Sequence, residues 1–358
     1  GWLRKRDDDV MTKRNVVILG ASGYTGAELL RLALDHPGMD IKAMTADRHA
    51  GKPVAAVFPQ FHGLQLPDLQ RIEEVDWNGI DAVFCCLPHG TTQDVISDLY
   101  NRFPQLVILD LSADFRLSDV LAYARWYGEH RAPSIQQYAV YGLVELQREA
   151  IRQARLVAVP GCYPTLAQLV LVPLVKAGVI VADDVIVDAK SGVTGAGRAA
   201  KEATLFSEVA DGFKAYSVAA HRHSAEIEQG MGWAGAGDVF VNFTPHLVPM
   251  NRGILESIYV RHAEGQDHAN LRQVLEESYR DEPFIQVLPE GVFPQTQHVR
   301  GTNQVRIGLI ADRIPGRTII VAVEDNLTKG ASGQAVQNFN VVFGYPETTG
   351  LTAAPLFP

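Results

Sequence analysis

The sequence predicts an α/β protein with two domains, a doubly wound parallel sheet followed by an α+β domain that contains a mixed sheet. Three observations support this prediction. The chain of 358 residues exceeds the usual size of one compact domain. Its first part alternates buried strand patterns with helical ones, which is typical of a parallel sheet. Strands with alternating apolar and polar residues, such as "VFVNFTPHL" and "ILESIYVRH", follow in the later part.

We expect the first domain over residues 11–161, the second over 162–329, and a C-terminal helix and tail over 330–358 that return to the first domain. Residues 1–10, "GWLRKRDDDV", lack the apolar core of a signal peptide and are left out of the fold argument. Strands with one covered face often serve subunit contact, so a homodimer or homotetramer is expected.

Composition narrows the class of partner. The formal charge of −9 argues against binding nucleic acid or an anionic membrane, which favours small molecules. Cys85, Cys86 and Cys162 are too few for a disulfide framework, which indicates a reducing compartment. No apolar run reaches the roughly 18 residues of a membrane span. We therefore expect a cytoplasmic protein, or one of the plastid stroma if the source is photosynthetic and a transit peptide has been removed.

The first organised segment, "NVVILGASGYTGAELLRL", reads as strand, glycine-rich turn and helix, and the strand "IKAMTA" follows. Such a βαβ unit is typical of Rossmann-type dinucleotide-binding domains, because its glycines let backbone N–H groups approach a diphosphate at the helix N-terminus. The spacing differs from the usual G-x-G-x-x-G, and a plain strand-turn-helix is the alternative. The residues expected at the cofactor in this turn are Gly20, Ser22, Gly23, Tyr24, Thr25 and Gly26.

The end of the second strand bears on the choice of cofactor. An acidic side chain there binds a ribose hydroxyl, whereas an arginine pairs with a 2′-phosphate. Thr45 and Arg48 favour NADP(H), while Asp47 leaves NAD possible. In the next loop, His89 is either a cofactor contact or, more commonly for a loop histidine, a partner of backbone groups.

Cys162 lies in "VAVPGCYPT", directly before an apolar helical pattern. A thiolate near a helix N-terminus is stabilised by the dipole and by free N–H groups, so Cys162 is a candidate nucleophile. A buried, inert thiol is the alternative from the local pattern alone.

A histidine turn, His221-Arg222-His223, precedes Ser224, which we expect to cap the next helix. Histidines two residues apart on an extended chain face the same side, and an imidazole ahead of a helix N-terminus is biased towards its neutral form. Either His221 or His223 is then a candidate base for Cys162. No further Cys or His completes a zinc site, so we expect no metal.

The loop "KSGVTGAGR" has enough glycine to bring backbone N–H groups near the nicotinamide or a phosphate, a flexible turn being the alternative. We assign Ser191 and Gly192 to the cofactor, and Gly195 and Arg198 to the substrate. Lys201 and Arg252 are expected to be solvated charges. Asn338, on the last helix, is a candidate for the nicotinamide carboxamide, or else a solvated amide.

Seven segments together resemble the N-acetyl-γ-glutamyl-phosphate reductase family of arginine biosynthesis and, more distantly, aspartate-semialdehyde dehydrogenase. They are "GASGYTGAELLRL", "CCLPHGTTQ", "DLSADFR", "VPGCYPT", "KSGVTGAGRAAKE", "HRHSAEIEQ" and "DNLTKGASGQAVQN". The resemblance implies NADPH-dependent reduction of N-acetyl-L-glutamyl 5-phosphate to N-acetyl-L-glutamate 5-semialdehyde, with release of phosphate.

The resemblance also implies roles for single residues. Cys162 carries the thioester intermediate. A histidine of the H-R-H turn is the acid/base, for which we favour His223 over His221 because it matches the His-Ser step of the distant relative. Arg116, by its place in "SADFR", resembles an arginine that binds the substrate phosphate; an ion pair with Asp114 or Asp119 is the alternative.

Two other functions remain open at this point. One is reduction of a related acyl phosphate, aminoadipyl or aspartyl. Tyr216 and Ser217 stand where the aspartate enzymes carry a carboxylate-binding arginine, which disfavours aspartyl phosphate. The other is a non-catalytic, NADP-sensing Rossmann protein, in which Cys162 would be inert.

Overall fold

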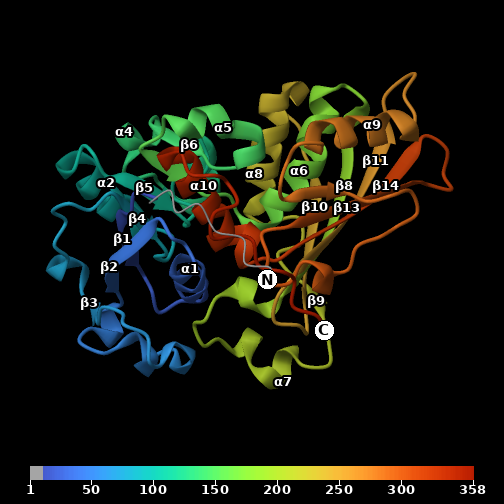
Figure 1. Ribbon diagram of the computed structural model, residues 1–358. Coiled ribbons are helices and arrows are strands. Elements are labelled where there is room, and N and C mark those ends of the chain that lie inside the picture. The colour runs from blue at the N-terminus through green and yellow to red at the C-terminus, as the bar shows by residue number, and fades with distance from the viewer. Residues whose placement is uncertain (1–10) are drawn as a thin grey trace, which may run out of the picture.

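The computed structural model describes residues 11–358 and contains two sheets, each of seven strands (Figure 1). The first sheet is parallel throughout, in the order β3-β2-β1-β4-β5-β7-β6, which confirms the doubly wound prediction. Its strands are β1 (Arg14–Leu19), β2 (Met39–Thr45), β3 (Leu69–Gln70), β4 (Ala82–Cys85), β5 (Val107–Asp110), β6 (Ala139–Tyr141) and β7 (Leu156–Ala158).

Helices cover both faces of this sheet because its strands are apolar on both sides. The connecting helices are α1 (Tyr24–Leu34), α2 (Thr92–Arg102), α3 (Val120–Tyr127), α4 (Pro133–Gln136) and α5 (Val144–Arg152). On one face, α1 shares a core with α10 (Gly333–Phe343), whose Phe339 lies 5.9 Å from Phe84 of β4. On the other face, Ile96 and Leu99 of α2 pack against the sheet. The last helix thus returns to the first domain.

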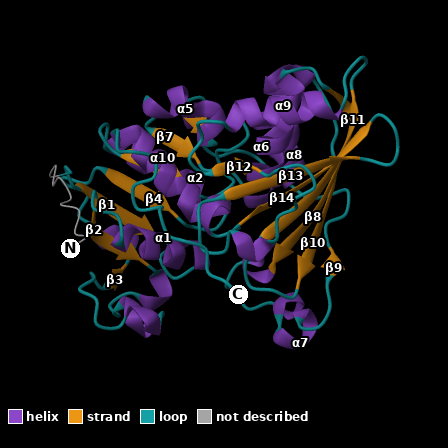
Figure 2. Ribbon diagram, turned by 45° about the vertical axis from the view of Figure 1, so that its right-hand side comes forward, coloured by secondary structure: helices purple, strands orange, loops and turns teal. Residues whose placement is uncertain are grey.

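The second sheet is mixed, in the order β12-β13-β14-β11-β8-β10-β9, as the alternating strands predicted (Figure 2). Its strands are β8 (Ile180–Gly192), β9 (Lys214–Ala215), β10 (Asn242–Val248), β11 (Ile254–His262), β12 (Ile285–Val287), β13 (Val305–Ala311) and β14 (Arg317–Glu324). The remaining helices are α6 (Cys162–Lys176), α7 (Phe206–Val209), α8 (His223–Met231) and α9 (His268–Tyr279).

The central helix is α6, which is apolar on nearly all sides and therefore buried. It shares a core with α9 and with one face of the second sheet. The chain enters α6 directly after β7, so Cys162 lies at the carboxyl edge of the first sheet. The loops that follow β1, β4 and β5 begin at this same edge. Ligands bind at this edge of doubly wound sheets. Within residues 11–358 no helix is long and apolar enough to cross a membrane.

Candidate active site

The glycine turn between β1 and α1 fits a dinucleotide diphosphate. Gly20 has φ +73°, and a Cβ there would lie 2.5 Å from the Cys86 carbonyl oxygen. The space in front of Gly23, the N-cap of α1, is open, with only one atom within 4 Å of an added Cβ. No side chain caps this helix and its first turn carries no acidic residue. The free N–H groups of α1 are therefore presented to an anion, as a dinucleotide requires.

Thr45 is buried at the end of β2, and its hydroxyl accepts a hydrogen bond from Gly20 N at 3.2 Å. Thr45 therefore stabilises the glycine turn at Gly20 through its side chain. Arg48 is exposed in the short 3-10 helix η1 (Asp47–His49) and forms no ion pair among residues 11–358. A free guanidinium beside this edge is suited to a 2′-phosphate.

Cys162 begins α6 and is partly buried. Burial, and secondly the Glu324 carboxyl, raise the pKa of its thiol to about 12. Burial outweighs the backbone hydrogen bond from Tyr163, which lowers this pKa, so the thiol is protonated in the resting protein. A base must take the proton when the thiol reacts.

The histidine turn, which lies beside the residue before Cys162, offers a candidate for that base. A Cβ added at Gly161 would lie 2.8 Å from His223 Nε2, which places this nitrogen beside the residue that precedes the nucleophile. Burial, and then the neighbouring His221 and Arg116 side chains, lower the pKa of His223 well below its usual value. Its Nδ1 is buried and has no hydrogen-bond partner among the described residues. His223 is therefore neutral, with one ring nitrogen that carries no proton.

His221 has a different position. Its Nδ1 accepts a hydrogen bond from the His223 backbone N–H at 3.1 Å, and the two rings lie 4.7 Å apart. The helix begins at His223, so the expected cap, Ser224, lies inside it; the His221 ring takes the place of a capping side chain because it reaches the first free N–H. Burial lowers the pKa of His221 to about 4.

Arg116 is buried behind this site. Its Nε donates to Val159 O at 2.8 Å, its Nη2 donates to Leu111 O at 2.9 Å, and its Nη1 lies 3.4 Å from Glu226 Oε2. The alternative of an ion pair with Asp114 or Asp119 is wrong: Asp119 accepts from Leu121 N, and Asp114 accepts from Gly90 N and the Tyr123 hydroxyl.

Sequence reasoning missed Glu226, which joins these parts. One of its oxygens accepts hydrogen bonds from Gly161 N at 2.9 Å and from the Tyr141 hydroxyl at 2.8 Å, while the other faces Arg116. The only sequence signal was its place in the first turn of the helix after His223, where an acidic residue is ordinary. Glu226 fixes the residue before Cys162 against both Arg116 and the turn that carries His223.

The candidate residues in and after the end of β8 have different surroundings in the structure. Ser191 is buried, with its hydroxyl donating to Gly192 O at 3.0 Å, and Gly195 lies close by, since a Cβ there would meet Ser191 Oγ at 3.1 Å. Arg198 instead reaches the first domain, where it contacts the carbonyl oxygen of Ser22 at 2.9 Å. Arg252 is not a solvated charge, because its Nη2 lies 2.6 Å from Glu28 Oε2 of α1.

Two other candidate cofactor contacts, Asn338 and His89, form hydrogen bonds with backbone groups of the protein. The side-chain amide nitrogen of Asn338 donates to Gly142 O and Gln334 O. Its side-chain oxygen, Oδ1, is buried and has no hydrogen-bond partner among residues 11–358. His89 Nδ1 accepts from Ala113 N at 2.9 Å, the backbone contact that was its commoner alternative.

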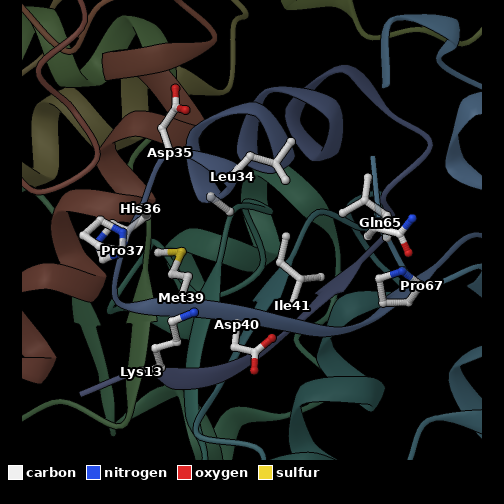
Figure 3. Close-up of a pocket in the computed structure, with 12 residues that line it drawn as sticks. Lys13, Leu34, Asp35, His36, Pro37, Met39, Asp40, Ile41, Gln65 and Pro67 are labelled. Carbon is white, nitrogen blue, oxygen red and sulfur yellow. The ribbon is translucent and has the colours of Figure 1, made fainter. Parts of the chain in front are cut away.

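A pocket at the opposite end of the first domain is a separate feature (Figure 3). It lies where α1 ends and β2 begins, hence at the amino end of a strand, and includes Lys13, His36 and Asp40. His36 is held there by Asn340 Oδ1 at 2.7 Å. The position is remote from the carboxyl edge that carries Cys162, so this pocket is not the site of chemistry.

A dinucleotide turn and a cysteine-histidine pair on one sheet edge define a class of two-domain dehydrogenases, and comparison with known families agrees. Residues 15–154 match "Semialdehyde dehydrogenase, NAD binding domain", and residues 162–326 match "Semialdehyde dehydrogenase, dimerisation domain". The chain is thus a semialdehyde dehydrogenase by class.

Within this class, the chain belongs to the N-acetyl-γ-glutamyl-phosphate reductase family. It is 59% identical to the N-acetyl-gamma-glutamyl-phosphate reductase of Rhodospirillum rubrum, over 96% of this chain and 99% of that protein. It is 55% identical to a probable chloroplastic enzyme of the same name from Arabidopsis thaliana, over 95% of this chain and 84% of that protein.

Solved structures share the fold. Aspartate semialdehyde dehydrogenase II of Vibrio cholerae superposes with a TM-score of 0.70 at 19% identity, covering 93% of this chain and 99% of that one. The enzyme of Candida albicans, solved with NADP, gives 0.67 at 18% identity, covering 93% and 99%.

Proposed function

We propose that the protein reduces N-acetyl-L-glutamyl 5-phosphate to N-acetyl-L-glutamate 5-semialdehyde and phosphate with NADPH, a step of arginine biosynthesis. The observation that carries the proposal is the position of His223 Nε2 beside Gly161, the residue before Cys162, at the same sheet edge as the open glycine turn. Membership of the reductase family, at 59% identity over nearly the whole chain, supports the choice of substrate.

Cys162 and His223 perform the covalent step. Cys162 Sγ attacks the acyl carbon while its proton passes to His223 Nε2, and the bond to the phosphate oxygen breaks, leaving a thioester and inorganic phosphate. A neutral His223 suits this transfer because it begins with a vacant nitrogen. Glu226 holds Gly161, and with it the start of α6, in place through the hydrogen bond from Gly161 N at 2.9 Å.

The remaining groups bind and orient. Gly20 to Gly26 and the N-terminus of α1 would hold the diphosphate, and Arg48 would hold the 2′-phosphate. When bound, NADPH supplies the hydride that reduces the thioester. The imidazolium of His223 then returns its proton to the departing Cys162 sulfur. Arg116 would bind the acyl phosphate through Nη1, because Nε and Nη2 donate to backbone oxygens whereas Nη1 only faces Glu226 Oε2 at 3.4 Å.

The test follows NADPH formation from N-acetylglutamate semialdehyde and NADP⁺, with and without phosphate. We expect phosphate-dependent turnover in the wild-type protein and loss of at least about 10³-fold in Cys162→Ala, since the thioester route is closed. Cys85→Ala, a fully buried thiol of β4, is the matched control and should retain turnover. Turnover that survives in Cys162→Ala would contradict the assignment. Turnover only with aminoadipate or aspartate semialdehyde would move it to a related acyl phosphate.

We further propose that the protein is a homodimer, and that the second sheet supplies the contact. One face of that sheet packs on α6 and α9, whereas Ile186, Tyr259 and Ile319 on the other face are half-exposed and aligned across β8, β11 and β14. The match to a dimerisation domain over residues 162–326 supports this contact. A homotetramer, and a location in the cytoplasm or plastid stroma, stay predictions.

A further inference from the structure

We propose that Arg198, a residue of the second domain, binds a phosphate group of NADP and so completes the cofactor site across the two domains. The proposal rests on the proposed function only through NADP binding and does not depend on which acyl phosphate is reduced. It replaces the sequence-based assignment of Arg198 to the substrate. The proposal is based on the contacts of the Arg198 guanidinium with Ser22 and Val57 of the first domain.

Arg198 spans from the second domain to the first. Its Nη1 donates to Ser22 O at 2.9 Å, and its Nη2 lies 3.3 Å from Val57 O. The guanidinium carbon lies 4.4 Å from the centre of the Phe58 ring. Ser22 belongs to the glycine turn that precedes α1, so the cation stands at the loop that faces the cofactor diphosphate. Figure 1 shows the yellow-green segment between β8 and β9 extending beneath α1.

The loop that presents Arg198 is anchored at its root. Val193 N donates to Met250 O at 2.9 Å, and the Thr194 hydroxyl donates to Asn251 O at 2.6 Å. Gly197, with φ +83°, then turns the chain in a conformation that side-chain-bearing residues rarely adopt. The guanidinium is therefore directed to the first domain by a fixed turn.

The present partners of Arg198 are weaker than a phosphate would be. Both hydrogen-bond acceptors are neutral carbonyl oxygens, and among residues 11–358 no carboxylate pairs with this guanidinium. Arginine binds phosphate through charge-assisted, often paired, hydrogen bonds that are about twice as strong as neutral ones. A cation whose only hydrogen-bond acceptors are carbonyl oxygens, at a turn suited to an anion, can exchange them for cofactor oxygens.

Arg198 could bind either of two phosphate groups of NADP, the diphosphate or the 2′-phosphate. The contact with Ser22 points to the diphosphate at the α1 N-terminus. The contacts with Val57 and Phe58, which share a core with Ala46 just after β2, point to the adenosine end and its 2′-phosphate. NADP⁺ and NAD⁺ differ only in the 2′-phosphate, so comparing them separates the two.

The experiment is calorimetric titration of the whole chain with NADP⁺ and with NAD⁺, in the absence of substrate. Arg198→Met should raise the Kd for NADP⁺ about tenfold or more, and Arg198→Lys should recover part of the loss because it restores the charge without the paired donors. Lys201→Met removes a charge from the same loop, at an exposed residue, and should leave both Kd values unchanged. Weakening of NADP⁺ alone assigns the 2′-phosphate, and equal weakening of both nucleotides assigns the diphosphate.

Three results would overturn the proposal. One is an unchanged Kd for both nucleotides in Arg198→Met. Another is a rise only in the KM for N-acetylglutamate semialdehyde or phosphate, which would restore Arg198 to the substrate. The third is an equal rise in the Kd for NADP⁺ in Arg198→Met and Lys201→Met, which would show that any positive charge on this loop has the same effect. Circular dichroism and the thermal midpoint of each variant identify a folding defect, for which Arg198→Lys is the second variant. Failure of the proposed function would appear separately, as NADP⁺ binding without turnover in the wild-type protein.

Discussion

Cys162 combines a helix N-terminus, which favours a thiolate, with burial, which opposes one. The structure shows that burial dominates, because the pKa of the thiol rises to about 12. A Cβ at Gly330 would lie 2.9 Å from Cys162 Cβ and 2.7 Å from Glu324 Oε1, so the sulfur-bearing residue is packed against a buried carboxyl. Burial also raises the pKa of Glu324 well above its usual value. In the proposed reaction, Cys162 would therefore lose its proton to His223 only when the substrate is bound.

The raised pKa of Cys162 predicts how the thiol reacts with iodoacetamide. In the protein without ligands the thiolate fraction is small at pH 7 and grows about tenfold per pH unit until pH approaches 12. The alkylation rate at Cys162, followed by mass spectrometry of the labelled peptide between pH 6 and 10, should rise throughout. A plateau below pH 8 would show an activated thiolate in the resting protein and contradict this account.

At the scale of elements, α1 is attached to the second domain as well as to its own sheet. Glu28 of α1 is buried and accepts hydrogen bonds from Arg252 at 2.6 Å and from the Thr328 hydroxyl at 2.8 Å, while Arg252 also lies 3.4 Å from Asp325. The hydroxyl of Ser332, in the C-terminal segment that returns to the first domain, also holds α1 by donating to Thr25 O at 2.7 Å. The helix that would hold the cofactor diphosphate is thereby fixed relative to the domain that carries His223.

Removing the Glu28 charge should destabilise the protein in a pH-dependent way. Burial alone would raise the pKa of Glu28, but hydrogen bonds from Arg252 and Arg31 outweigh it and lower the pKa from 4.5 to about 2. Its contribution is thus complete above pH 4.5 and lost as the pH falls towards 2. At pH 7, Glu28→Gln should cost about 2–3 kcal/mol, somewhat less than for a fully buried pair because Arg252 is partly exposed.

Urea unfolding measured at pH 7 and at pH 3 tests this prediction. The midpoint of Glu28→Gln should lie well below that of the wild-type protein at pH 7, with a smaller difference at pH 3. Asp98→Asn is the matched control, since Asp98 forms an exposed ion pair with Arg102 within α2 and should shift the midpoint little. An equal difference at both pH values would show that packing, and not charge, accounts for the loss.

At the scale of the whole molecule, the half-exposed face of the second sheet carries an apolar row. Tyr259 is paired with Ile186 on one side and with Ile319 on the other, and Ile319 is paired in turn with Ile310. Adjacent strands bring these side chains onto one face. A stable interface buries about 800 Å² on each partner, which a seven-stranded sheet can supply.

Tyr259→Asp should therefore convert a dimer to a monomer, because it places a charge in the centre of the contact. Light scattering after size-exclusion chromatography gives the mass directly. Tyr138→Asp alters an exposed aromatic residue of the first domain and should leave the mass unchanged. A wild-type protein of monomer mass, or a Tyr259→Asp variant of unaltered mass, would contradict the proposed contact.

Prediction from the sequence succeeded where a local pattern determines the result. The turn from Gly20 to Gly26 is recognisable because its glycines, strand and helix are contiguous, and Cys162 is placed at a helix N-terminus by Gly161 before it and Pro164 after it. The two classes of sheet followed from apolar runs in one part and alternation in the other. Ser224 failed as a cap because the helix begins one residue earlier, at His223, whose N–H donates to the His221 ring.

The sequence by itself determined the two sheets and the glycine turn, and it singled out Cys162 and the two histidines as candidates, because each of these features depends on neighbours within a few residues. Only the tertiary structure decided which distant group each charged side chain contacts. Glu226 reaches Gly161 across 65 positions, Arg252 reaches Glu28 across 224, and Arg198 reaches Ser22 across 176. Such contacts, and the burial that sets the pKa of Cys162 and His223, arise only when distant segments pack together. No local pattern encodes them.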